Sequence, residues 1–76
     1  MGSGPAEIAA LMGSILDVDE LGTDESFFEY GNSLLALKLL ATVEQRYGAR
    51  VSLLELVRAP TPVQLSELVA RAGQAS

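Results

Sequence analysis

Apolar side chains recur at helical spacing near the start of the chain, directly after a short run of glycine and serine. They lie three or four positions apart, at Ile8, Leu11, Met12, Ile15 and Leu16. Residues with this spacing share one face of an α-helix, and proline is tolerated in a first helical turn. The pattern therefore predicts a first helix over residues 5–16.

A polar and acidic connection follows over residues 17–32. Connections of this length usually contain some structure of their own, and we expect a short helical turn at residues 23–26. The few apolar side chains of the connection are expected to hold it against the helices; they are Val18, Leu21, Phe27 and Phe28.

The next apolar run predicts a second helix that begins at Asn32 or Ser33 and ends near Tyr47, with Gly48 as the left-handed closing residue. With about 100° of rotation per residue, one side of this helix is predicted to face the core, namely Ala36, Leu40, Val43 and Tyr47, with Leu39 beside them. The opposite side, here called the outer strip, is only partly apolar and consists of Leu34, Lys38, Ala41 and Gln45.

Two further helices are predicted from their starting residues. Ser52 and Glu55 have the spacing of a capping box, which predicts a short third helix that ends before Pro60. Residues 61–62 have the Thr–Pro order of a helix cap and first position, so a last helix is expected to run to about residue 72. Its apolar side chains are Val63, Leu65, Leu68 and Val69, and Gly73 is expected to close it.

No stretch alternates between apolar and polar residues in the manner of a strand. The predicted fold class is therefore all-α, a small four-helix bundle with three long helices and one short helix. We also expect no membrane-spanning segment, since no run approaches the roughly 18 apolar residues of a membrane helix. The start lacks the pattern of a signal peptide, so the expectation is a cytoplasmic monomer.

Composition and charge exclude several kinds of function. The chain has no Cys and no His, so it has no thiolate nucleophile, no zinc thiolate cluster and no imidazole for acid–base catalysis. Of its charged residues, seven acidic and no basic ones lie in residues 1–37, whereas five basic and three acidic ones lie in residues 38–76. Scattered arginines in an acidic chain do not favour nucleic acid, and a basic protein partner fits better.

The acidic connection partly matches a calcium-binding loop, with Asp17, Asp19 and Gly22 at its first, third and sixth positions. Leu21 and Phe28 stand at the fifth and twelfth positions, where calcium requires oxygen ligands. We therefore predict no metal site and interpret the connection as a solvated acidic loop, with loose binding of divalent cations as the alternative.

Ser33 is the candidate functional residue, because it lies where a Gly–Asn turn meets the apolar second helix. The start of a helix offers unpaired N–H groups and the positive end of the helix dipole, which suit a phosphate ester on the serine oxygen. A serine at this place is more often only a helix cap. Glu29, the one nearby candidate base, is expected to face solvent, so we predict no enzymatic activity of the chain itself.

The run from Phe27 to Leu37 resembles the modification site of acyl and peptidyl carrier proteins. Two aromatic residues precede a Gly–Asn turn, a serine follows, and a leucine-rich helix comes next. The resemblance extends over residues 6–70 and includes the segment 56–65, which resembles the family's connection into its last helix. Carriers commonly have Gly-x-Asp-Ser at the turn, whereas residues 31–33 are one residue shorter and contain Asn in place of Asp.

The resemblance implies that a phosphopantetheinyl transferase, using Mg²⁺, attaches 4′-phosphopantetheine from coenzyme A to Ser33. The thiol of this arm would hold an acyl or aminoacyl thioester. Further implied partners are an adenylating enzyme that loads the cargo and downstream synthase or tailoring enzymes. Residues 6–72 would be the carrier domain, residues 1–5 a flexible tail or cloning remnant, and residues 73–76 a second flexible tail.

The expected partner-binding residues lie on the second helix and are Leu34, Leu35, Lys38, Ala41 and Gln45. Fatty-acid carriers present an acidic helix here, so this weakly charged surface is more similar to carriers of nonribosomal peptide and polyketide assembly. Leu34 is expected to insert into partner pockets, with an ordinary exposed leucine at the bundle edge as the alternative. The alternative function for the whole chain is an unmodified helical interaction module.

Overall fold

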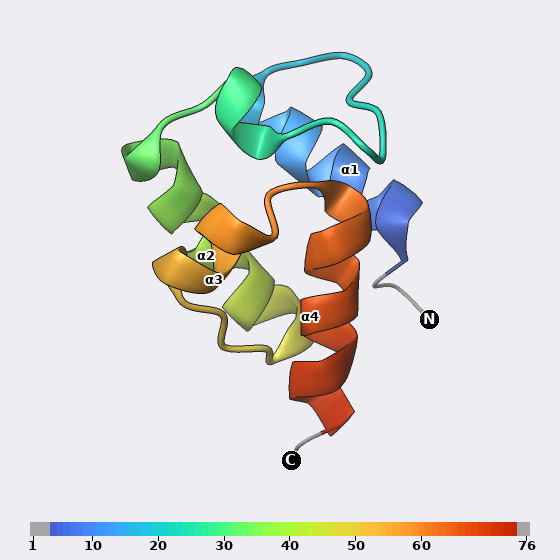
Figure 1. Ribbon diagram of the computed structural model, residues 1–76, viewed down its shortest axis with the longest axis vertical. Helices are drawn as coiled ribbons and strands as arrows, with labels where there is room; N and C mark the ends of the chain where they lie inside the picture. Colours follow the sequence, from blue (N-terminus) through green and yellow to red (C-terminus); the bar gives the residue numbers. More distant parts are fainter. Residues whose placement is uncertain (1–3, 75–76) are drawn as a thin grey trace.

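Four α-helices and one short 3₁₀ helix form within residues 4–74, the part of the chain that this computed structural model describes. They are α1 (Pro5–Leu16), η1 (Phe27–Glu29), α2 (Ser33–Tyr47), α3 (Leu53–Arg58) and α4 (Pro62–Gln74). No strand occurs in this part, so the predicted all-α bundle is confirmed. Figure 1 shows the connection between α1 and α2 over the end of the bundle at which α4 begins.

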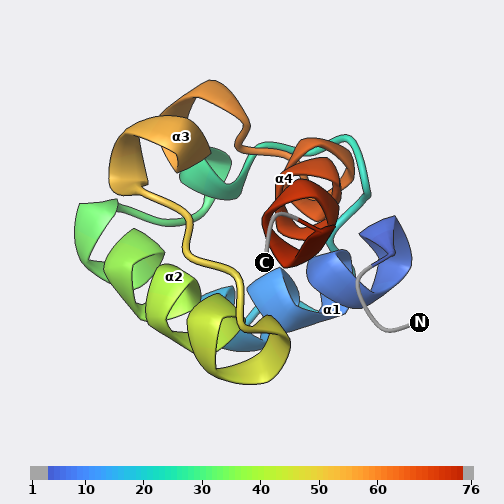
Figure 2. The ribbon, with the colours of Figure 1, turned by 90° about the horizontal axis from the view of Figure 1, so that it is seen from below.

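Helix α1 has the predicted bounds. It begins with Pro5 and ends at Leu16, after which Asp17 adopts a left-handed conformation with a φ of 61°. The N–H of Val18 then donates to the carbonyl oxygen of Gly13 at 2.9 Å, which turns the chain back along the helix. In Figure 2, α1 runs beside both α2 and α4, and α3 lies across the remaining side.

The connection between α1 and α2 contains a helical turn, but the predicted position at residues 23–26 is wrong. Residues 22–25 form a turn, in which the N–H of Glu25 donates to the carbonyl oxygen of Gly22 at 3.1 Å and the Glu25 carboxylate accepts from the N–H of Gly22 at 2.6 Å. The 3₁₀ helix begins after this turn, at Phe27, because the Ser26 hydroxyl caps it by accepting from the N–H of Phe28 at 3.2 Å. The side chain cap thus decides where the turn can start.

Buried side chains and backbone hydrogen bonds hold this connection to the rest of the bundle. Phe27 is fully buried and Leu21 nearly so, while Val18 and Phe28 are half-buried, which agrees with the predicted anchoring role. The N–H of Phe27 donates to the carbonyl oxygen of Pro60 at 2.9 Å. The N–H of Val63 donates to the carbonyl oxygen of Thr23 at 3.1 Å, so the connection is fixed both to the segment between α3 and α4 and to the first turn of α4.

The core lies between the three long helices and is completed by α3 and the two connections. Its buried members are Ile8, Leu11, Met12, Leu21, Phe27, Ala36, Leu39, Val43, Ala49, Val51, Leu56, Leu65 and Val69. On the predicted core side of α2, Ala36 and Val43 are fully buried as predicted, whereas Leu40 and Tyr47 are half-buried. Leu39, predicted to lie beside this side, is fully buried. Helix α2 contacts α1, α3 and α4, and this arrangement of neighbours centres its buried face on Leu39.

The later helices confirm the predicted caps but not the predicted last residue. Ser52 and Glu55 form the complete capping box of α3, and the Thr61 hydroxyl accepts from the N–H of Gln64 at 3.2 Å at the start of α4. Helix α4 continues through Gly73 to Gln74, so the expected closure at Gly73 is wrong. A glycine costs only about 1 kcal/mol inside a helix and does not by itself end one.

Two expectations concern the ends of the chain and its relation to membranes. Residues 1–3 and 75–76, within the expected tails, lie outside the described residues. None of the helices within residues 4–74 has both the length and the apolar character that a membrane crossing requires.

Candidate functional site

Asn32 is the capping residue of α2. Its backbone is extended, and its side-chain Oδ1 accepts from the N–H of Leu35 at 3.0 Å. Its carbonyl oxygen accepts from the N–H of Ala36 at 2.9 Å and so begins the helical hydrogen-bond series. The predicted start of the second helix at residues 32–33 is confirmed. The plainer interpretation of Ser33 as the cap is wrong, because the preceding residue supplies the capping oxygen.

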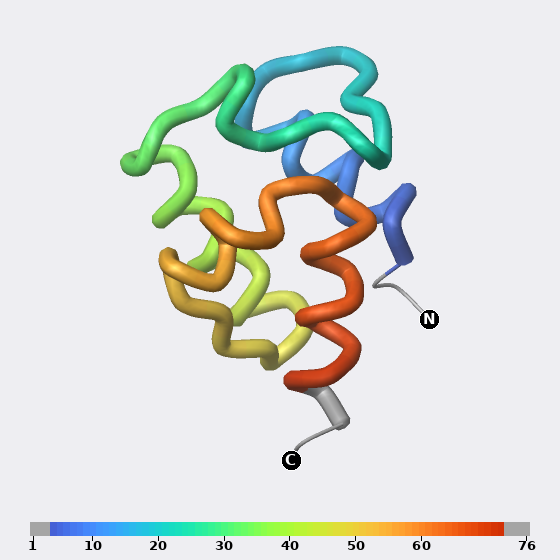
Figure 3. The backbone as a smooth tube through the Cα atoms, in the orientation of Figure 1, coloured from blue at the N-terminus to red at the C-terminus, as the bar shows by residue number. Residues whose placement is uncertain are grey.

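Ser33 is the first residue of α2, and its side chain is exposed. The N–H groups of Ser33 and Leu34 belong to the first helical turn, where the helix itself provides no acceptor for them. Together with the helix dipole, these donors favour negative charge at this end of α2. Figure 3 shows that the chain enters α2 at the outer edge of the molecule, so the hydroxyl is open to an approaching macromolecule.

The aromatic pair Phe27 and Phe28 holds the segment before Ser33 on the side that faces the core. The carbonyl oxygen of Phe27 accepts from the N–H groups of Tyr30 at 3.3 Å and of Gly31 at 3.0 Å. The rings of Phe27 and Phe28 meet edge to face, with 5.6 Å between their centroids. Because Phe27 is fully buried, its backbone provides an immobile base for the turn that leads to Ser33.

Tyr30 fastens the exposed side of the same segment. Its hydroxyl donates to a carboxylate oxygen of Glu25 at 3.1 Å, and the other oxygen of that carboxylate accepts from the N–H of Gly22. The hydrogen bond to Glu25 and the negative charge of that carboxylate raise the pKa of Tyr30 above its usual range. The turn before Ser33 is therefore held at two points, one in the core and one at the surface.

The acidic residues of the described part of the chain form no cluster at the site. Glu29 is exposed, as expected from the sequence. Within residues 4–74, no three acidic side chains are grouped so that they could hold a metal ion. The site offers an exposed serine and helix N–H groups that favour negative charge.

Four of the five predicted partner-binding residues are exposed on α2. Leu34 is 75% exposed, and the rest of the outer strip, Lys38, Ala41 and Gln45, is exposed as well. Leu35 differs, because it is half-buried and packs against the core. The difference follows from the rotation of the helix, which turns Leu35 towards the same side as Leu39.

Sequence reasoning missed three exposed apolar residues on α2 and α3. Leu37 on α2 is 53% exposed, and Leu54 and Val57 on α3 are 62% and 53% exposed. The spacing of Leu54 and Val57, three positions apart in a short helix, was the available signal for a second apolar face. With these residues added to the outer strip, α2 and α3 expose more apolar surface than the sequence predicted.

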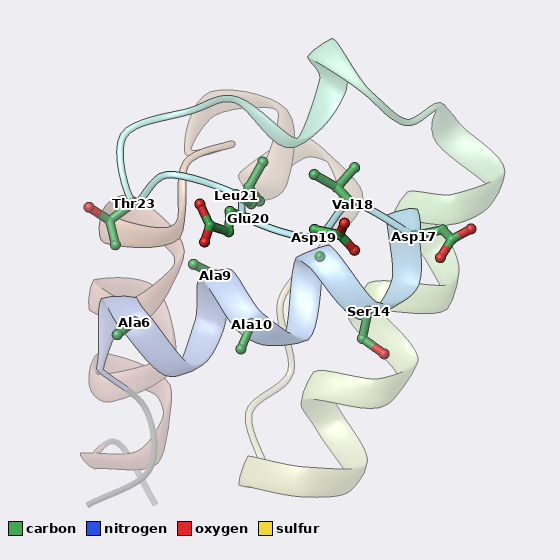
Figure 4. A pocket seen from close by; sticks show the side chains of 11 residues that line it. Ala6, Ala9, Ala10, Ser14, Asp17, Val18, Asp19, Glu20, Leu21 and Thr23 are labelled. Carbon is green, nitrogen blue, oxygen red and sulfur yellow. The ribbon is translucent and has the colours of Figure 1, made fainter.

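A groove of about 600 Å³ lies elsewhere, between α1 and the first half of the connection. One wall consists of small residues of α1, namely Ala6, Ala9, Ala10, Gly13 and Ser14. The other wall includes the carboxylates of Asp19 and Glu20, which Figure 4 shows beside the connection. Ser33 does not line this groove, and it is exposed at the start of α2.

Comparison with known proteins identifies the family. A family model described as a phosphopantetheine attachment site matches residues 6–69. The chain belongs to this family of phosphopantetheine-binding carriers. The prosthetic group of the family is 4′-phosphopantetheine, and the carrier domain described here is of the type found in nonribosomal peptide and polyketide synthesis.

Two curated relatives illustrate the similarity. The chain is 33% identical over 67 residues to surfactin synthase subunit 1 of Bacillus subtilis (strain 168), a match that covers 87% of the chain and 2% of that protein. It is 39% identical over 70 residues to malformin synthetase mlfA of Aspergillus luchuensis (strain CBS 106.47), covering 90% of the chain and 1% of that protein. The carrier domain thus spans a very small part of the length of these relatives.

Solved structures share the fold. A chain in the complex of the phosphopantetheine transferase Sfp with coenzyme A and a peptidyl carrier protein has a TM-score of 0.84 and 28% identity, with 88% of each chain covered. BlmI, a type-II acyl carrier protein from Streptomyces verticillus involved in bleomycin biosynthesis, has a TM-score of 0.79 and 29% identity, with 88% of this chain and 82% of that chain covered.

Proposed function

We propose that Ser33 is the attachment residue of the carrier domain. The observation that carries the proposal is the position of this serine. It is exposed and is the first residue of α2, and the preceding residue, Asn32, caps the helix. The family match supports it, because residues 6–69 include this helix start. The chain then holds an acyl or aminoacyl group for enzymes of nonribosomal peptide or polyketide assembly.

The residues around Ser33 fit a phosphodiester. The N–H groups of the first helical turn and the helix dipole favour its negative charge. Asn32 stands next to the serine and adds no negative charge of its own, so it does not repel the group. The prosthetic group supplies a terminal thiol, which this chain cannot provide because it has no Cys.

The attachment step needs no catalytic group from the carrier domain. A transferase removes the proton from the Ser33 hydroxyl, and the serine oxygen forms a bond to the phosphorus that bears the pantetheine portion of coenzyme A. The bond from that phosphorus to the remaining phosphate breaks, and the adenosine bisphosphate portion leaves. The carrier domain contributes an accessible nucleophile in a fixed place, and it is the substrate of this step and not its enzyme.

The exposed surface of α2 and α3 is suited to docking through apolar contacts. Leu34 and Leu37 from α2 and Leu54 and Val57 from α3 are all more than half exposed. Charged residues on this part of α2 are few, with Lys38 as the one charged member of the outer strip. We propose that the transferase, an adenylating enzyme and the later synthase or tailoring enzymes use this surface in turn.

Intact mass spectrometry tests the attachment. The protein is incubated with coenzyme A, Mg²⁺ and a broad-specificity phosphopantetheinyl transferase, and we expect a mass gain of one phosphopantetheine group. The variant Ser33→Ala should gain no mass, whereas Ser14→Ala, which removes an exposed serine from α1, should gain mass like the unaltered protein. An unchanged mass of the unaltered protein with several competent transferases would favour the unmodified interaction module.

A further inference from the structure

Gly31 occupies a place in which a side chain does not fit. A Cβ atom at this position would lie 2.5 Å from Cδ2 of Leu16 and 3.1 Å from Cε2 of Phe27. Among the described residues, the glycine with a positive φ is Gly48 and not Gly31. Gly31 is therefore needed for space and not for an unusual backbone conformation.

The two neighbours of Gly31 differ in how easily they can move away: Phe27 is fixed in the core, whereas Cδ2 of Leu16 is the end of a flexible side chain. Phe27 is fully buried and meets the ring of Phe28 edge to face. Leu16, the last residue of α1, is half-buried and packs against the core. A side chain at position 31 would have to displace Leu16 or lift the turn away from both residues.

A shift of this turn would also move Ser33, the candidate nucleophile. Gly31 is separated from Ser33 by Asn32 alone, and Asn32 is committed to the cap through its bond to the N–H of Leu35. On the other side, the N–H of Gly31 is bonded to the carbonyl oxygen of Phe27. A turn this short, bonded at both ends, has no spare residue that could absorb a shift before it reaches the serine.

We propose that Gly31 is a positioning residue for the modification of Ser33, and that Leu16 at the end of α1 is the neighbour that excludes a side chain there. The bare backbone of Gly31 lets the turn pass close to α1, and this passage sets where the serine oxygen is presented to the transferase. The proposal rests on the proposed function, because it assumes that Ser33 is the residue modified. It places the requirement for glycine in the contact with α1, a helix that does not carry the serine.

The first test is the transferase kinetics of Gly31→Ala. We expect kcat for phosphopantetheine transfer to fall by about 10- to 100-fold, the range known for small displacements of reacting groups, with KM changed by less than about threefold. KM is conserved because the exposed surface of α2 and α3 is untouched. Circular dichroism at the assay temperature establishes that the variant is folded.

Gly13→Ala is the matched control for lost stability. A Cβ at Gly13 would lie 2.8 Å from the carbonyl oxygen of Val18, so this variant also strains the packing of the connection on α1. Gly13 lines the groove beside α1 and is not part of the turn before Ser33. We expect Gly13→Ala to lower the melting temperature while kcat stays within about twofold of the unaltered protein.

The second test is rescue by making room. Leu16→Ala removes the Cδ2 atom that the new side chain would meet. The double variant Leu16→Ala/Gly31→Ala should therefore regain most of the kcat that Gly31→Ala loses. The double variant should nevertheless be less stable than Gly31→Ala. Leu16→Ala alone should keep kcat within about threefold while losing stability. If Gly31→Ala does not fold, the comparison of Leu16→Ala with the double variant, whose kcat values should agree, carries the test.

The outcomes separate this proposal from the proposed function. If the unaltered protein is never modified, the proposed function fails. If it is modified and folded Gly31→Ala is modified at the same kcat, the positioning proposal alone is overturned. It is equally overturned if Gly13→Ala slows transfer as much as Gly31→Ala at a similar loss of stability, or if the double variant has a kcat far below that of Leu16→Ala.

Discussion

The amino end of α2 and the groove beside α1 are both built where a helix meets the same connection, yet they offer opposite surfaces. At α2 a capped helix presents an exposed hydroxyl and free N–H groups at the edge of the molecule. Beside α1 small side chains and carboxylates line a hollow of about 600 Å³ that Ser33 does not reach. Under the proposed function, the hollow surface of this carrier domain is not the reactive one.

The difference is instructive because concave pockets are the usual first hypothesis for a functional site. That expectation suits an enzyme, which must surround its substrate. A protein that is itself a substrate needs the reverse, a group that projects into the active site of another protein. The two regions can be tested against each other through the residues that build them.

The largest expected effect comes from Phe27, which supports both regions through the connection. Phe27→Ala removes a fully buried ring and should lower the free energy of unfolding by about 3 to 5 kcal/mol. Phe28→Ala, at a half-buried ring, should cost clearly less. Urea denaturation followed by circular dichroism measures both, and equal losses would contradict the assignment of Phe27 as the anchor.

The next effect separates the two surfaces in partner binding. Leu34→Asp places a charge on a residue that is 75% exposed, and we expect it to raise the transferase KM by roughly tenfold, equivalent to about 1.4 kcal/mol of contact energy. Ala10→Gln enlarges an exposed side chain in the groove and should leave KM unchanged. Steady-state transfer kinetics compare them, and a KM increase in Ala10→Gln instead would place docking on the α1 side.

A smaller effect concerns Asn32, which caps the amino end of α2. Asn32→Ala removes the oxygen that accepts from the N–H of Leu35 and should lower the free energy of unfolding by about 1 kcal/mol. Asn32→Asp keeps an acceptor at that place and adds a charge that the helix dipole favours, so its stability should equal or exceed that of the unaltered protein. Thermal denaturation at low salt checks the order, and Asn32→Asp below Asn32→Ala would contradict it.

The smallest effect appears at alkaline pH, at the far end of α2. The hydroxyl of Tyr47 donates to the carboxylate of Glu7 on α1 at 2.8 Å. Partial burial, followed by this hydrogen bond and the charge of Glu7, raises the pKa of Tyr47 above its usual range. Because the folded protein holds this proton more tightly, its contribution to stability is present below roughly pH 10 and is lost as the pH rises through the folded-state pKa.

Tyr47→Phe should therefore reduce the loss of stability between neutral pH and strongly alkaline pH. Denaturation curves at a series of pH values measure this dependence for the variant and the unaltered protein. Tyr30→Phe is the useful comparison, because the pKa of Tyr30 is also raised, through its bond to Glu25. An unchanged alkaline profile in Tyr47→Phe would show that the link between α1 and α2 adds nothing to stability.

Helix starts were the part of the fold that local sequence predicted best. The Asn–Ser pair before α2, the capping box of α3 and the Thr–Pro pair before α4 each led to the observed starting residue. A cap needs only a side-chain oxygen and an N–H two or three residues later, so all of its parts are adjacent in the chain. The same reasoning placed Ser33 at the amino end of α2.

Features that depend on distant neighbours were predicted less well. The full burial of Leu39 and the exposure of Leu54 and Val57 escaped the sequence pattern. The wrong end of α4 at Gly73 and the wrong position of the helical turn at residues 23–26 were, by contrast, errors of local reasoning. Burial and exposure are different in kind. These properties are set by which helix lies on which side, and periodicity gives the apolar side of a helix only to within about one residue position.

The order of residues alone determined that the chain forms four helices, where each of them starts, and that its one candidate nucleophile stands at the amino end of the longest helix. Tertiary structure decided which surfaces of those helices remain open and that the end of α1 abuts the backbone of Gly31. Caps and periodicity act through hydrogen bonds within a few residues, whereas exposure and close approach arise only when segments far apart in the chain exclude water from one another.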